Sequence, residues 1–138
     1  MIKEIVKDEE FLTKKSETIS IEEAQEIITD LIETATEHID HCVGLAAPQI
    51  GVLKRVVVIG TGTSFFPMVN PVIVKTSGKK FFNHEGCLSL EGTRMTTRYS
   101  TVLVSYLDRT GKRVTKTFNG LQAIIIQHEV DHLNGILI

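Results

Sequence analysis

The segment His128-Glu129-Val130-Asp131-His132 carries the residue types best suited to chemistry in this chain. Two histidines four residues apart project from one face of a helix, so both imidazoles can reach one metal ion. Glu129 then lies beside the ion and can take a proton from a metal-bound water without being a ligand. A metal lowers the pKa of that water toward neutrality, and the carboxylate completes a generator of hydroxide. The segment therefore predicts a metal-dependent hydrolase.

A third metal ligand has to come from upstream, because no side chain in the segment 133–138 binds metals well. The upstream residues with suitable donor atoms are His38, His41, Cys42, His84, Glu85 and Cys87. A thiolate is a strong ligand for borderline metals, and Gly86 would let the backbone beside Cys87 approach closely. Cysteine is also commonly a small buried residue with no other role. Spacing alone therefore favours Cys87 no more than the other candidates together.

Length and composition indicate a single globular domain, residues 1–138, of ordinary polarity. Of the 138 residues, 42% are hydrophobic and 23% charged, and the net charge of -2 gives no indication of nucleic-acid binding. We find neither an apolar signal-peptide region nor a membrane-length apolar run, so the expected location is the cytoplasm, away from membranes. The two cysteines, Cys42 and Cys87, are then expected to be reduced thiols.

Periodicity and capping predict the elements of the first two thirds of the chain. Ser20 and Glu23 have the spacing of a capping box, and apolar residues at three- and four-residue intervals predict an amphipathic helix over 21–39. The Gly- and Pro-containing segment 44–51 indicates irregular backbone. β-Branched and aromatic residues predict strands at 2–6, 55–59, 68–74, 80–82, 101–107 and 113–118. A turn at 108–111 would join the last two strands as a hairpin.

The two histidines lie on a predicted helix that begins after Asn119, which can serve as its N-cap. The run Ile124-Ile125-Ile126 suits a helix that is buried on nearly all sides. We therefore expect an α+β fold. Antiparallel strands would pack around this central C-terminal helix, and an N-terminal amphipathic helix would complete the fold.

Three segments together resemble the signature motifs of the peptide deformylase family. They are Gly44-Leu45-Ala46-Ala47-Pro48-Gln49, Glu85-Gly86-Cys87-Leu88-Ser89 and His128-Glu129-Val130-Asp131-His132-Leu133-Asn134-Gly135. One motif alone would be weak, but three in the family's order and at plausible spacing are highly specific. The resemblance spans nearly the whole chain and is to the short form of the family, without a C-terminal helix extension.

The resemblance implies a ligand set and a reaction. Cys87, His128 and His132 would hold one divalent metal ion, with ferrous iron expected and zinc or nickel able to replace it. The reaction would be hydrolysis of the N-formyl group from the N-terminal methionine of newly synthesised polypeptides, with release of formate. Metal-bound hydroxide would attack, and Glu129 would act as general base and then general acid. The Gln49 side chain and the Leu88 N–H would stabilise the oxyanion.

The resemblance also implies how substrate binds. N-formylmethionyl peptides would be the partners, with docking on the ribosome left open by the short C-terminus. An extended peptide could pair with the segment Val43-Gly44-Leu45 as an added strand. The remaining substrate-binding positions carried over from the family are Arg94, Leu121, Ile124 and Ile125. Core packing explains the apolar ones among them equally well.

Departures from the family pattern keep other functions open. Cys42 stands where the family has glycine, and it would narrow the pocket mouth or place a second thiol near the metal. A zinc endopeptidase is one alternative, although the missing downstream ligand and the Gln49 segment argue against it. A catalytically weak, deformylase-like protein that binds metal and peptide is another. A hydrolase with Cys87 as nucleophile would leave the spacing of the two histidines and Glu129 without a purpose.

Overall fold

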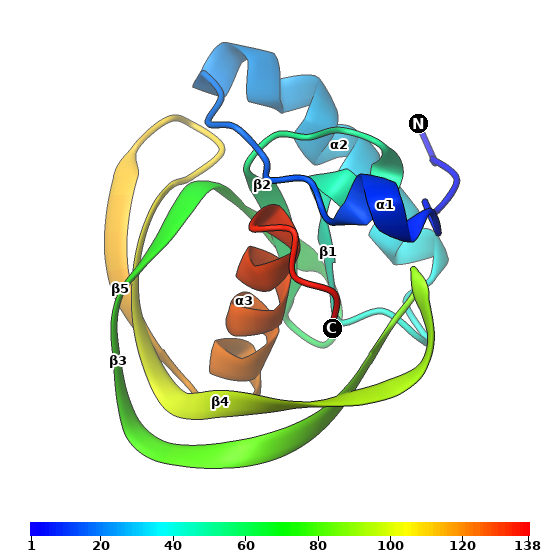
Figure 1. Ribbon diagram of the computed structural model, residues 1–138. Helices are drawn as coiled ribbons and strands as arrows, with labels where there is room; N and C mark the ends of the chain where they lie inside the picture. Colours follow the sequence, from blue (N-terminus) through cyan, green and yellow to red (C-terminus); the bar gives the residue numbers. More distant parts are fainter.

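A computed structural model describes residues 1–138 and has the expected α+β architecture (Figure 1). The three α-helices are α1 (Glu9–Leu12), α2 (Ile21–Glu37) and α3 (Gly120–Leu133). The five strands are β1 (Gly44–Ala46), β2 (Val56–Gly60), β3 (Phe65–Cys87), β4 (Leu90–Leu107) and β5 (Arg113–Asn119), and a short 3-10 helix η1 covers Ala47–Ile50. The strands form one antiparallel sheet in the order β1-β2-β3-β4-β5.

The long strands β3 and β4 curve around α3, so that the helix lies in the hollow of the sheet (Figure 1). Four register irregularities interrupt their pairing, between Val69 and Val72, Ile73 and Lys75, Ser77 and Lys80, and Glu85 and Cys87. Such irregularities bend a strand and increase its twist, which explains the curvature. The two strands expected at 68–74 and 80–82 are therefore parts of one strand.

Strand β2 separates two parts of the core, because successive side chains of a strand point to opposite faces. Val57 and Ile59 pack on the α3 side, together with Ile126 and Leu133 of that helix. Val56 and Val58 pack on the other side, against buried residues of α2 such as Leu31. The expectation of a buried C-terminal helix is confirmed, since most of α3 is buried from Ala123 onward.

Five details of the sequence interpretation need correction. Residues 2–6 form no strand; the Val6 N–H donates instead to the Gln49 carbonyl at 2.8 Å. The helix expected over 21–39 ends at Glu37, and the first part of the 44–51 segment is strand β1. Strand β4 begins at Leu90, eleven residues before the start expected at Thr101. Asn119 precedes α3 but accepts a hydrogen bond from Thr101 Oγ1 rather than capping the helix.

None of the helices combines the length and apolar character needed to cross a lipid bilayer.

Candidate metal centre

Cys87, His128 and His132 meet at the junction of the β3–β4 hairpin with α3. One donor atom from each of the three lies within 4.8 Å of the other two. The cysteine ends β3, just before the two-residue turn that leads into β4, whereas both histidines lie one helical turn apart on α3. The long hairpin thus carries the thiol across the sheet to a helix whose histidines are some forty positions later in the chain.

The geometry of these donors fits a divalent ion. The Nε2 atoms of His128 and His132 lie 3.1 Å apart. Two nitrogen ligands of one tetrahedral zinc-sized ion lie roughly 3.3 Å apart when each bond is about 2.0–2.1 Å. Two imidazoles and one thiolate also match the ligand preferences of borderline metals. The cluster therefore satisfies both the spacing and the donor chemistry that a divalent metal requires.

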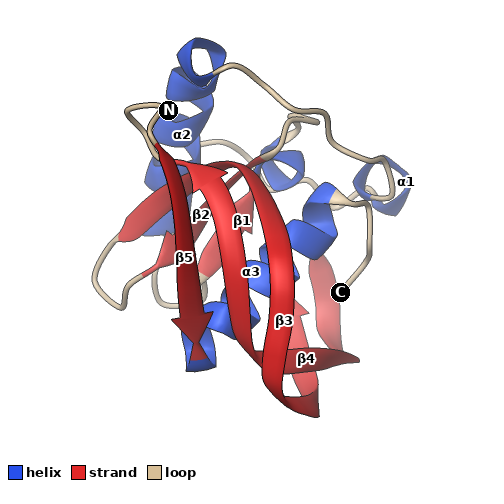
Figure 2. Cartoon of the chain, turned by 90° about the vertical axis from the view of Figure 1, so that its left-hand side faces the viewer, coloured by secondary structure: helices blue, strands red, loops and turns tan.

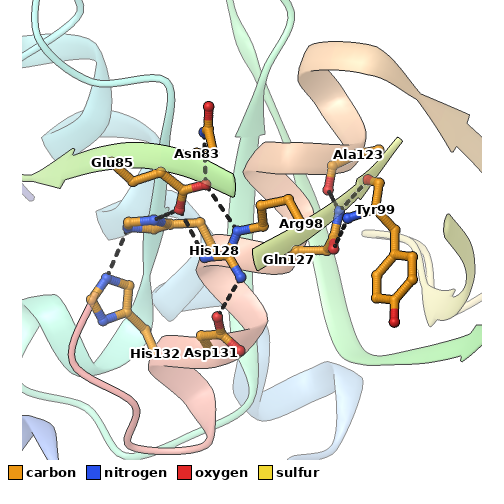
Figure 3. A network of polar contacts seen from close by, with 9 residues as sticks. All are labelled: Asn83, Glu85, Arg98, Tyr99, Ala123, Gln127, His128, Asp131 and His132. Carbon is orange, nitrogen blue, oxygen red and sulfur yellow. Dashed lines mark hydrogen bonds and ion pairs between the residues drawn. The ribbon is translucent and has the colours of Figure 1, made fainter. Parts of the chain in front are cut away.

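A buried acid–base network holds His128 in place (Figure 3). Nδ1 of His128 lies 2.7 Å from Oε1 of Glu85, and the Arg98 guanidinium donates to both oxygens of that carboxylate at 2.9 and 2.7 Å. Nη1 of Arg98 donates to Asp131 at 2.7 Å. Because the ionised carboxylate of Glu85 can only accept, His128 donates through Nδ1. Its Nε2 atom faces the donor cluster, where metal binding would require Nε2 to lose its proton.

The pKa values in the protein without metal follow from burial and these contacts. Burial opposes ionisation of Glu85, but hydrogen bonds from His128, Arg98 and Asn83 outweigh it and lower the pKa to about 2. Burial likewise opposes the charge on His128, yet contacts with Cys87 and Glu85 raise its pKa to about 10. Burial and the neighbouring charge of His128 lower the pKa of His132 to about 3. The network therefore separates the two imidazoles into one strong and one weak base.

Glu129 lies beside the cluster with a free acceptor. Its side chain is 3% exposed, and its Oε1 atom has no hydrogen-bond partner. Burial raises the pKa of this carboxyl to about 7. Burying a carboxylate oxygen without a hydrogen-bond partner costs free energy. A water or a substrate group is therefore expected to donate a hydrogen bond to it. The placement suits a group that accepts and returns a proton near neutral pH.

Gly44 makes room for this carboxylate. A Cβ atom at position 44 would lie 2.8 Å from Glu129 Oε2 and 2.7 Å from Ile125 Cγ2. The first motif therefore needs glycine because β1 passes directly over α3. Gly86 differs, since a Cβ there would meet its nearest atom at an ordinary 3.4 Å. The expectation that Gly86 serves close backbone approach is therefore wrong.

Gln49 presents its donor end to the same cavity as Glu129. Its Oε1 atom accepts from the Ala46 N–H at 3.0 Å, which leaves the amide Nε2 facing Ser89 Oγ at 3.3 Å. Leu88 and Ser89 form the turn between β3 and β4, so the residues expected to supply oxyanion donors lie on two elements around one space. Both Gln49 and Leu88 line the cavity described next.

A cavity of about 200 Å³ adjoins the donor cluster. Its lining residues include most of the expected substrate-binding positions, namely Val43, Gly44, Leu121, Ile124 and Ile125. Two others are placed elsewhere. The Leu45 side chain is fully buried in the core against α2, and Arg94 faces Glu9 at 4.0 Å without lining the cavity. Strand β1 is an edge strand, so one side of its backbone has no strand partner.

Cys42 also lines the cavity and donates its thiol to the Gly44 carbonyl at 3.2 Å. Burial raises the pKa of this thiol to about 12, which keeps it neutral. Since a metal binds the thiolate form, Cys42 is poorly suited to be a ligand, and it does not belong to the three-residue donor cluster. Of the two effects expected of this residue, narrowing of the pocket is the one its placement favours.

Sequence reasoning missed the residues that support the cluster. Arg98 is 4% exposed and pairs with carboxylates from β3 and α3, yet its sequence context is that of an ordinary polar strand. Gln127 binds both the N–H and the carbonyl of Tyr99, which fastens α3 to β4 (Figure 3). Asp131, the fourth residue of the histidine segment, could have indicated this network. A carboxylate next to two metal ligands is usually hydrogen-bonded, here to Arg98.

Fold and donor cluster together define an α+β hydrolase with a candidate metal centre, and comparison with known proteins gives the family. The family model of polypeptide deformylase matches residues 2–138. The chain belongs to this family and is an enzyme that removes the N-formyl group from newly made peptides.

Individual relatives agree with this assignment. The chain is 50% identical to the peptide deformylase of Clostridium beijerinckii over 138 residues, which is 100% of both chains. It is 43% identical to that of Thermodesulfovibrio yellowstonii, over 94% of this chain and 82% of the relative. Among solved structures, the Met-Ala-Ser-bound class I type b peptide deformylase from Acinetobacter baumannii superposes with a TM-score of 0.88 at 32% identity, covering 99% and 96% of the two chains. The Thermotoga maritima enzyme gives 0.89 at 32% identity, covering 99% and 95%.

Proposed function

We propose that this chain hydrolyses N-formylmethionyl peptides at a divalent metal held by Cys87, His128 and His132. The observation that carries the proposal is the buried, unpartnered Oε1 of Glu129 beside these three donors. When bound, the ion would supply a Lewis acid and lower the pKa of water, as metals do in hydrolases. We expect ferrous iron in the cell, with zinc or nickel able to replace it, by family resemblance. We expect a cytoplasmic location, because newly made polypeptides are the proposed substrates.

The protein's own groups would divide the work as follows. Glu129 would take the proton of the attacking water at its free Oε1 and deliver it to the leaving amine, a transfer that its raised pKa favours. Gln49 Nε2 and the Leu88 N–H would stabilise the negative oxygen that develops on the formyl group. Ala46 fixes the orientation of the Gln49 amide before substrate arrives, so little reorganisation is needed.

The methionine side chain would enter the 200 Å³ cavity, whose wall includes Ile124 and Ile125. The free edge of β1 would pair with the backbone of the extended peptide. The complex of the A. baumannii relative with Met-Ala-Ser supports this choice, because that tripeptide is the product expected from formyl-Met-Ala-Ser. Arg94 would act on parts of the peptide outside the cavity.

The decisive assay measures formate released from formyl-Met-Ala-Ser by anaerobically purified enzyme, with and without a chelator. We expect chelator-sensitive release, and Glu129→Gln should keep its metal but lose about 100-fold or more in rate. Glu26→Gln, an equal change on the exposed face of α2, is the matched control and should change nothing. Full activity without metal would exclude the metal mechanism. Full metal occupancy without turnover would favour the binding-protein alternative, and cleavage of an internal peptide bond would favour an endopeptidase.

We further propose that residues 1–138 act as one domain. Both parts of the core share strand β2, so neither can unfold without exposing the other. Far-ultraviolet circular dichroism and near-ultraviolet absorption of the tyrosines should then report one coincident transition in urea. Two separated transitions would contradict a single domain.

A further inference from the structure

The net charge of -2 conceals a strong separation of charge along the chain. Residues 1–64 contain six lysines and arginines against twelve acidic residues, whereas residues 65–119 contain nine against three. The second stretch comprises β3, β4 and β5. The low net charge, from which no nucleic-acid binding was expected, therefore averages an acidic N-terminal half with a basic sheet.

Three of these nine cations, Lys75, Lys80 and Arg113, lie on the outer face of this sheet. Directly paired residues of antiparallel strands share a face, and the buried Val102, Val104 and Arg98 define the inner one. The residues next to these three along β4 point outward. The residues of β3 and β5 that pair with those outward-pointing residues point outward as well. We call the following residues the basic face: Lys75, Lys80, Phe82, His84, Tyr99 and Arg113.

Helix α2 packs against this face at Leu107, and the part of the face that carries Lys75, Lys80 and Phe82 is exposed. Figure 2 shows β3–β5 in front of α3, with no helix on the near side of the sheet. Lys75, Lys80 and Arg113 are exposed and have no carboxylate within 4.0 Å. The three acidic residues of this stretch are elsewhere, since Glu85 is buried on the inner face and the other two lie near the β3–β4 and β4–β5 turns.

Aromatic rings stand among these cations. Phe82 is 76% exposed, the largest exposed fraction among the big apolar residues of the chain. Its neighbour on the same face, Lys80, places its ammonium 5.9 Å from the centre of the Tyr99 ring. Cations that follow phosphates, interleaved with rings on which bases stack, are the combination that single-stranded nucleic acids recognise. An acidic protein surface would use the cations but would have no specific need for a bare phenyl ring.

We propose that the basic face binds single-stranded RNA, with Lys75, Lys80 and Arg113 on the phosphates and Phe82 stacked on a base. The face is separate from the reaction cavity, because its side chains leave the sheet on the side opposite α3. The proposal therefore does not depend on the assigned deformylase chemistry. It gives the sheet a second role, that of holding the enzyme close to RNA.

The test is fluorescence anisotropy of a labelled oligouridine of about twelve nucleotides, a typical site size for such surfaces. With about three phosphate contacts, the slope of log affinity against log salt should be roughly -2. Binding should then weaken about 20-fold between about 50 and 200 mM NaCl. Absence of binding at the lower salt concentration would overturn the proposal.

Two variants separate charge from stacking. The double substitution Lys75→Gln/Lys80→Gln should reduce the salt slope by about 1.4. Phe82→Ala should weaken binding about tenfold while the slope stays unchanged. Lys14→Gln/Lys15→Gln removes the same charge from exposed positions near α1 and should change neither quantity. An equal effect of the control pair would show that binding depends only on the total charge of the protein, and it would overturn the proposal.

A competition experiment tests the class of partner. Unlabelled oligouridine should displace the probe, whereas vesicles of phosphatidylglycerol and polyglutamate at equal charge should not. Displacement by vesicles alone would assign the face to a membrane surface, and displacement by polyglutamate alone would assign it to an acidic protein. Either result would overturn the RNA proposal. Turnover of formyl-Met-Ala-Ser by the same variants should be unchanged, since none of the substituted residues lines the cavity.

Discussion

Oε1 of Glu85 lies 2.7 Å from Nδ1 of His128, and the same oxygen lies 2.7 Å from Nη2 of Arg98. One buried carboxylate oxygen thus joins a helix imidazole to a strand cation. Removing its charge should affect metal binding and folding together, whereas a residue with only a packing role would affect folding alone.

Glu85→Gln keeps the shape of the side chain and removes this charge. Metal affinity should fall about 10–100-fold, because His128 loses the partner that orients it. The free energy of unfolding without metal should fall by about 3 kcal/mol, since Arg98 stays buried with only Asp131 as a counter-charge. Competition with a chromogenic chelator and urea unfolding measure the two effects. Glu91→Gln, an exposed change near the hairpin turn, is the control, and equal metal affinity in both variants would contradict the orienting role.

Gly44→Ala should reduce deformylation about 100-fold, because the new methyl group would displace the Glu129 carboxylate. Gly86→Ala is a matched change in the adjacent motif, where the structure leaves ordinary room, and it should keep most of the activity. Formate release by both variants, with circular dichroism as a check on folding, measures the difference. A Gly86→Ala enzyme as damaged as Gly44→Ala would show that the space around position 86 is tighter than the structure indicates.

Cys42 should resist alkylation at pH 8. A thiol reacts as the thiolate, and burial raises the pKa of Cys42 to about 12, so that about one molecule in ten thousand carries the reactive form at this pH. Because the thiolate fraction rises about tenfold for each pH unit below that pKa, labelling by iodoacetamide should still accelerate at about pH 10, where the labelling of a free cysteine has levelled off. Mass spectrometry of a Cys87→Ser variant isolates the reaction of Cys42. Labelling at pH 8 as fast as that of a cysteine in a short peptide would refute the prediction.

Ser20 and Asn119 both precede helices but should differ in their contribution to stability. The Ser20 hydroxyl accepts from the Glu23 N–H at 3.3 Å, so Ser20→Ala should cost about 1 kcal/mol. Asn119 makes no capping bond, and its exposed contact with Thr101 should contribute only about 0.5 kcal/mol. Urea unfolding at neutral pH compares the two variants. A larger loss for Asn119→Ala would mean that its side chain caps α3 in solution.

Local signals predicted the parts of the fold that depend on local interactions. The capping box at Ser20 correctly located the start of α2, and the isoleucine run correctly indicated a buried helix. Strand prediction failed where pairing decides the structure. The polar segment 91–100 has few apolar residues, and it is extended because β3 lies beside it. Residues 2–6 have the composition of a strand but find only isolated partners, such as the Thr34 hydroxyl that accepts from the Lys3 N–H.

The candidate site likewise has parts that local sequence predicts and parts that only the fold brings together. Its three motifs were readable because each is a short run with its own chemistry. The pairing of Arg98 with Glu85 and Asp131 was not, because the three residues come from two strands and a helix. Burial of a charge becomes visible only once the fold brings its partners together.

Strand β3 carries different roles on alternate residues between positions 80 and 87. Asn83 and Glu85 face the helix and the donor cluster, while Phe82 and His84 face outward. Deleting or inserting one residue in this stretch would exchange the two sets, placing a phenyl ring against Arg98 and a carboxylate on the surface. Over evolutionary time, relatives should therefore vary in the outward-facing residues of this stretch far more readily than in its length.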